Sequence, residues 1–105
     1  MNPLRLVFSP LAQGDLKKIF QYGQTNWGKT EATSYLEKLK GRLWYLTEYP
    51  EIGKKREELL PLMRSLVVEQ HVVFYQIRKE QIDIIRVLHG RQDPQTHIIT
   101  PENNG

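Results

Sequence analysis

Hydrophobic and polar positions alternate near the start of the chain, where Leu4, Leu6 and Phe8 occupy every second place. This period of two predicts a short strand with one inward face. The next two residues, Ser9 and Pro10, are typical of a helix start, because serine caps the first turn and proline needs no hydrogen-bond partner there. The chain therefore begins with a strand that leads directly into a helix.

Two apolar stripes at helical spacing come next and predict two helices. The first helix ends at the Trp27-Gly28 pair. The second helix runs from about Thr30 to Pro50, because proline cannot continue the hydrogen-bond ladder. The stripe residues are Ala12, Leu16, Ile19, Phe20, Gly23 and Trp27 in the first helix and Ala32, Tyr35, Leu36, Leu39, Leu43 and Leu46 in the second. The short junction NWGK predicts an antiparallel helical hairpin.

The segment 50–61, PEIGKKREELLP, is polar and has proline at both ends, which predicts a loop. Three strand-like runs follow at 63–69, 71–78 and 82–89. The links between them are too short for a crossover, so neighbouring strands must be antiparallel. The run HVVFYQIR at 71–78 is apolar on both faces, and we expect it in the centre of the sheet.

The predicted order is β-α-α-β-β-β, an α+β fold in which an N-terminal strand is followed by a helical hairpin that packs on a small antiparallel sheet. We expect one domain over residues 1–98 and a flexible tail over 99–105, because ITPENNG has no periodicity. A length of 105 residues with 39% hydrophobic residues fits a single compact core.

Composition removes several classes of function. The chain has no cysteine, which excludes disulfides, thiol nucleophiles and cysteine-based zinc sites. It has neither the apolar region of a signal peptide nor the roughly 20 apolar residues of a membrane helix. We therefore expect a cytoplasmic protein without membrane contact. The net charge of +3 is mild, and residues 50–105 hold eight basic and eight acidic residues, so charge identifies no partner.

Metal and cofactor chemistry has little support in the sequence. His71, His89 and His97 lie at none of the usual ligand spacings, and we expect no metal site. The sequence contains no phosphate-binding glycine loop, dinucleotide fingerprint or serine-nucleophile turn, so we expect no cofactor.

The stretch IIRVLHGRQD at 84–93 has residue types suited to RNA cleavage, which needs an acid, a base and cations around the phosphate. His89 and Arg91 could supply part of this set. The cations that could join them are Lys54, Lys55, Arg56 and Arg64. The structural alternative is that Arg86 and Arg91 pair with Asp93 or with glutamates on a solvated face.

Two surface features point to a protein partner. Trp44 and Tyr45 each fall about 130° from the centre of the second stripe. Either a neighbouring element covers them, or they form an exposed aromatic patch of the kind found in protein–protein contacts. The basic run GKKRE at 53–57 is either solvated or a contact site.

Five blocks carry a family resemblance. They are SPLAQGDLKKIFQYGQTNWG, AxxYLxxLxxRLxxL at 32–46, YPEIGKKREEL, MRSLVVEQHVVFYQI and IIRVLHGRQD. In this order and spacing, from about Leu6 to Ile98, the chain resembles the ParE toxins of the RelE/ParE superfamily of type II toxin–antitoxin systems.

The resemblance implies a toxin that poisons DNA gyrase by binding, blocks replication and serves plasmid stabilisation. It also implies neutralisation by a ParD-like antitoxin, usually a ribbon-helix-helix dimer, whose C-terminal segment is disordered when free and folds around the toxin. Contact with operator DNA would be indirect, through the antitoxin, and a toxin dimer within a hetero-oligomer is expected.

Site residues follow from the same resemblance. We expect gyrase contact at His89, Arg91, Asp93 and His97. We expect antitoxin contact at Trp44, Tyr45, Lys54, Lys55 and Arg56, or in the groove between the helical hairpin and the sheet. The alternative is the RelE-like branch, the ribosome-dependent mRNA interferases, whose catalytic set would fall on Arg64, Arg91 and His97. A third alternative is a decayed toxin that has no activity and survives only as a binding module.

Overall fold

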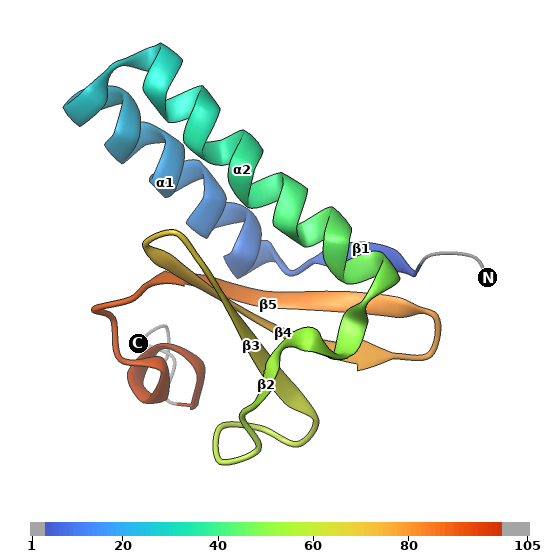
Figure 1. The fold of residues 1–105 in the computed structure, drawn as a ribbon. Coiled ribbons are helices and arrows are strands. Elements are labelled where there is room, and N and C mark those ends of the chain that lie inside the picture. Colours follow the sequence, from blue (N-terminus) through green and yellow to red (C-terminus); the bar gives the residue numbers. More distant parts are fainter. Residues whose placement is uncertain (1–3, 100–105) are drawn as a thin grey trace.

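The computed structural model describes residues 4–99, and Figure 1 shows how their helices and strands are arranged. In chain order the elements are β1 (Arg5–Phe8), α1 (Pro10–Trp27), α2 (Lys29–Glu48), the 3-10 turn η1 (Pro50–Ile52), β2 (Lys54–Lys55), β3 (Met63–Val68), β4 (His71–Arg78), β5 (Gln81–His89) and the π-helical turn η2 (Gln95–Ile99). The predicted α+β fold with the order β-α-α-β-β-β is confirmed. Of the predicted tail, only Ile99 lies within the described residues, and it ends η2.

The sheet has the strand order β1-β5-β4-β3-β2. β3, β4 and β5 are antiparallel neighbours, and β4 is internal, as predicted. β1, however, pairs with β5 in parallel, with Phe8 opposite Ile84. The prediction of a loop over the whole segment 50–61 is wrong, because Lys54–Lys55 forms the edge strand β2 against β3. A strand of two residues has no periodicity that the sequence could reveal.

The helical hairpin begins and turns as its sequence predicts. The Ser9 side chain accepts a hydrogen bond from the Ala12 N–H at 3.0 Å, and Pro10 opens α1. Gly28 joins the helices with φ of 99°, a conformation that other residues rarely adopt. A Cβ on Gly23 would lie 3.1 Å from the Cβ of Ala32, so the small residue lets α1 and α2 approach closely.

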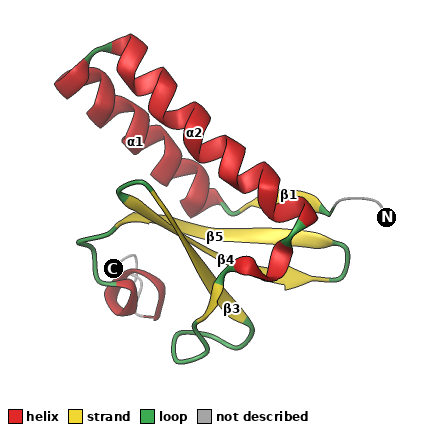
Figure 2. Cartoon of the chain, in the orientation of Figure 1, coloured by secondary structure: helices red, strands yellow, loops and turns green. Residues whose placement is uncertain are grey.

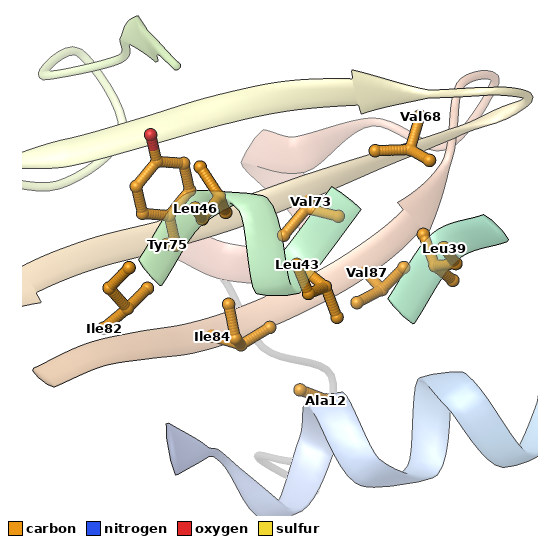
Figure 3. Close-up of a cluster of buried hydrophobic side chains, with 10 residues drawn as sticks. All are labelled: Ala12, Leu39, Leu43, Leu46, Val68, Val73, Tyr75, Ile82, Ile84 and Val87. Atoms are coloured by element: carbon orange, nitrogen blue, oxygen red, sulfur yellow. The ribbon is translucent and has the colours of Figure 1, made fainter. Parts of the chain in front are cut away.

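Both long helices lie on one side of the sheet (Figure 2). Between them and the strands lies the main core, in which Leu39, Leu43 and Leu46 of α2 meet Val73 and Ile84 of the sheet (Figure 3). A second cluster is built from Leu59, Met63, Phe74 and Leu88, and Ile98 of η2 packs against it. None of the helices within 4–99 is long and apolar enough to cross a membrane.

A register shift between β4 and β5 positions the site. Tyr75 lies opposite Ile84 and Phe74 lies opposite Arg86, which leaves Ile85 as an extra residue. Because of this bulge, Ile84 and Val87, three residues apart, both join the core that the helices cover. Arg86 is thereby placed within hydrogen-bond distance of α1.

Candidate functional site

A cleft of about 560 Å³ opens beside the last residues of β5, lined by α1, the β3–β4 turn and the segment after β5. Most of the residues that were predicted to contact gyrase lie here. His89, Arg91 and His97 line the cleft, and Asp93 belongs to the same segment without lining it. The structure therefore gathers at one end of the sheet the residues that the resemblance singled out.

An ion pair between α1 and β5 lies at this cleft and is almost inaccessible to solvent. Asp15 accepts hydrogen bonds from Nε and Nη2 of Arg86, both at 2.8 Å, and from the Val87 N–H at 2.9 Å. The exposed fractions of the two side chains are 10% and 8%. The alternative that Arg86 and Arg91 pair with Asp93 or with glutamates on a solvated face is therefore wrong for Arg86. A short bidentate pair of this kind fixes geometry as well as charge.

Asp15 reaches β5 because the neighbouring strand β1 ends before that point. β1 pairs with β5 only as far as Ile84, and the chain then turns into α1. Backbone groups of β5 beyond that point need other partners. The Ser9 hydroxyl donates to the Ile85 carbonyl at 2.8 Å, and Asp15 accepts the Val87 N–H. The start of α1 thus replaces the missing strand.

A second polar chain connects α2 with the sheet. The Gln70 N–H donates to the Tyr35 oxygen at 3.0 Å, and that oxygen lies 2.6 Å from Nδ1 of His71. Since the oxygen already accepts from Gln70, we assign its O–H as the donor to Nδ1, which leaves the proton of His71 on Nε2. Burial lowers the pKa of His71 to about 4, and His89 adds a smaller effect in the same direction, so the ring is neutral at pH 7. Burial also raises the pKa of Tyr35.

Five rings follow one another in a row, and four of them, Tyr22, Trp27, His71 and His89, line the cleft. Their centroids are separated by 6.1 Å from Tyr22 to Trp27, 5.9 Å from Trp27 to Tyr35, 5.5 Å from Tyr35 to His71 and 5.3 Å from His71 to His89. Contacts of this length and tilt are favourable for aromatic rings. We call this row of residues the aromatic wall. It runs from the tip of the helical hairpin to the end of β5.

The segment after β5 is held by a local polar network. Nδ1 of His89 accepts the Arg91 N–H at 3.1 Å. The Asp93 carboxylate accepts from the Gln95 N–H and from the Thr96 hydroxyl, both at 3.1 Å. Arg86 donates to the His97 carbonyl at 2.9 Å. The buried pair with Asp15 is therefore joined directly to η2.

Trp44 and Tyr45 are exposed rather than covered by another element, with 63% and 43% of each residue accessible. Tyr45 stacks on Tyr49 at 4.8 Å, and the Arg42 guanidinium lies 5.1 Å from the Tyr45 ring. We call these four residues the α2 patch. Rings that stack on one another at the surface form a rigid contact area of the kind enriched in protein interfaces.

The basic run does not form one surface. Lys54 and Lys55 are consecutive in β2, so their side chains leave opposite faces of the strand. Arg56 is partly buried and is committed to the fold, because it pairs with Glu58, donates to the Ser65 hydroxyl and lies over the Phe74 ring. Only the two lysines are exposed for a partner.

The residues of the alternative nuclease set are separated. Arg64 donates to the carbonyls of Glu51 and Gly53 at 3.0 and 2.8 Å and so holds η1 against β3. Its cross-strand position leads through Tyr75 to Ile84, seven residues before Arg91. Only Arg91 and His97 meet at the cleft. Within the described part of the chain, no three His, Asp or Glu side chains form a group that could hold a metal ion.

Sequence reasoning missed the Asp15–Arg86 pair and the Tyr35–His71 contact. A signal was present for the first: Asp15 is a lone acid beside the apolar stripe of α1, and Arg86 is a lone cation in the run IIRVL. A single opposite charge on each of two buried faces predicts a pair. Nothing in the spacing of Tyr35 and His71 predicts their contact, which depends on how the hairpin crosses the sheet.

Comparison with known proteins agrees with this architecture. A sequence model of the family described as "ParE toxin of type II toxin-antitoxin system, parDE" matches residues 6–94. Toxin ParE1 of Mycobacterium tuberculosis is 36% identical, over 85% of this chain and 92% of its own length. Toxin ParE1 of Caulobacter vibrioides is 34% identical, over 93% of this chain and 99% of its own length.

Structural comparison supports the same fold. A chain described as "Chromosomal ParDE TA system from P. aeruginosa" superimposes with a TM-score of 0.72, covering 82% of this chain and 95% of that one at 19% identity. The family match spans most of the domain, and both of the named relatives exceed 30% identity over more than four-fifths of the chain. The chain therefore belongs to the ParE toxin family of type II toxin–antitoxin systems.

Proposed function

We propose that the protein inhibits DNA gyrase in the cytoplasm, thereby blocks replication, and is neutralised by direct binding of a ParD-like antitoxin. The observation that carries this proposal is the segment from His89 to His97, which presents four of its polar side chains at the cleft. The polar network and the Arg86 bond to the His97 carbonyl hold this segment in one conformation. A preorganised surface favours inhibition by binding, because little ordering is left to oppose association.

The α2 patch is our proposed docking site for the antitoxin. Its stacked rings and the exposed lysines of β2 lie on consecutive parts of the chain, with η1 between them. An antitoxin segment that places apolar side chains on the rings and carboxylates near Lys54 or Lys55 would complement both features. Because the antitoxin would be the DNA-binding partner, any operator contact is indirect, and a toxin dimer would form within that hetero-oligomer.

Supercoiling of relaxed plasmid by purified gyrase tests the proposal. Wild-type protein should inhibit supercoiling, and a stoichiometric amount of the cognate antitoxin should restore it. Primer extension on translating ribosomes is run in parallel with the same preparation and should show intact message. Normal supercoiling together with cleaved message would refute gyrase inhibition and favour the mRNA interferase.

A further inference from the structure

Two cations at the cleft have no acidic partner among residues 4–99. Both line the cleft: Lys18 lies on α1, and Arg91 lies in the segment after β5. The ion pairs of this part of the chain involve Arg56, Arg78 and Arg86 instead. The charge of Asp15, which also lines the cleft, is compensated by Arg86. The cleft therefore favours an anion.

Aromatic surface lies beside these cations. Tyr22 is one helical turn after Lys18, so the ring and the ammonium group share a face of α1. Tyr22 and Trp27, the first two members of the aromatic wall, are 65% and 44% exposed. Ile19 and Val87 add apolar lining. An anionic group bound at the cations would thus have ring surface within the same cleft.

We propose that the cleft binds a nucleotide unit, with the phosphate held by Lys18 and Arg91 and the base stacked on Trp27 or Tyr22. Arginine is well suited to phosphate because its planar donors match two phosphate oxygens, and lysine contributes a second, compact charge. Aromatic side chains next to a cationic groove are the combination that binds unpaired nucleotides. The cleft volume lies within the range of small-ligand sites.

This site goes beyond the proposed function, because it requires neither gyrase nor an antitoxin. A free mononucleotide and an unpaired nucleotide of DNA or RNA offer the same chemistry, a phosphate joined to a base. An acidic peptide would use the same two cations but would gain less from the aromatic wall. The ring row therefore favours the nucleotide.

NMR titration of the full-length protein tests the proposal. Trp44→Phe leaves Trp27 as the single tryptophan, so one indole N–H resonance reports on the cleft. The probes are adenosine 5′-monophosphate, adenosine, inorganic phosphate, a short single-stranded DNA and a peptide of glutamate and leucine. The monophosphate should shift the Trp27 resonance saturably and bind at least about tenfold more tightly than adenosine or phosphate alone.

Matched variants locate the phosphate. Lys18→Ala and Arg91→Ala should each weaken binding of the monophosphate about tenfold, whereas Lys17→Ala, which removes the same charge from α1 outside the cleft, should leave it unchanged. Thermal melts establish that each variant is folded. Tighter binding of the single-stranded DNA than of the monophosphate would support the proposal and identify nucleic acid as the source. Equal binding of phosphate and monophosphate, tighter binding of the peptide, an equal effect of Lys17→Ala, or no shift would each overturn it.

Discussion

Replacing Asp15 with alanine leaves the Arg86 guanidinium and the Val87 N–H buried without their acceptor. The carboxylate accepts three hydrogen bonds of 2.8, 2.8 and 2.9 Å, and both charged side chains are at most 10% exposed. Breaking a buried pair by removing one partner costs about 3–5 kcal/mol. A domain of this size has roughly 5–15 kcal/mol of stability in total. Asp15→Ala should therefore remove a large fraction of the free energy of unfolding.

Urea unfolding, monitored by circular dichroism, measures this loss as a shift of the unfolding midpoint. The slope of the free energy of unfolding against urea concentration should stay the same. Arg86→Ala should cost a similar amount, because it leaves the Asp15 carboxylate buried without its guanidinium partner. The double variant Asp15→Leu/Arg86→Met should be more stable than either single variant, since apolar residues of similar size do not need a charge partner. Glu58→Ala, which breaks an ion pair with an exposed acid, is the control and should leave the midpoint unchanged within error.

Two results would refute this reasoning. One is a loss below about 1 kcal/mol in both single variants, the range of exposed pairs. The other is a double variant Asp15→Leu/Arg86→Met that is no more stable than the single variants, because the loss would then not come from an unpaired buried charge.

Three further predictions follow from the contacts. Because the pKa of His71 is about 4 in the folded protein and near 6.5 when unfolded, the unfolded chain binds more protons between these values. Stability should then fall as pH decreases from about 6.5 to 4, and His71→Asn should reduce this slope in urea titrations; an unchanged slope contradicts the assignment. Gly53→Ala should lower stability by about 1–3 kcal/mol in thermal melts, because its Cβ would overlap the Tyr75 side chain and lie 2.9 Å from the Ser65 carbonyl. Gly41→Ala, in open space within α2, should instead raise stability by about 0.5–1 kcal/mol, and equal effects at both sites would contradict the contact. Trp44→Ala should weaken the antitoxin complex at least about tenfold in calorimetry without loss of folding, and unchanged affinity would place the antitoxin elsewhere.

The main elements were predictable because their sequences are locally consistent. The Ser9 cap, the two helical stripes and the alternating runs each favour the structure that they adopt. The exposure of Trp44 and Tyr45 follows from the helical wheel, since the stripe alone packs on the sheet. The parallel pairing of β1 depends instead on where the hairpin returns the chain, which no local pattern determines.

The site was predicted only in part. His89, Arg91 and His97 are near in sequence, and the end of β5 brings them to one cleft. Asp15 and Arg86 are 71 residues apart, so their pairing depends on the tertiary fold. The same holds for Arg64, which was grouped with Arg91 by residue type and lies elsewhere in the sheet.

The central claim is that the end of β5 acts on gyrase, and the amount of linear plasmid trapped in a gyrase cleavage assay tests it most directly. Wild-type protein should increase the linear product. Arg91→Ala should reduce this effect at least about tenfold, while Lys17→Ala should behave as wild type. No linear product above background with folded wild-type protein in excess, or full activity of Arg91→Ala, would contradict the account.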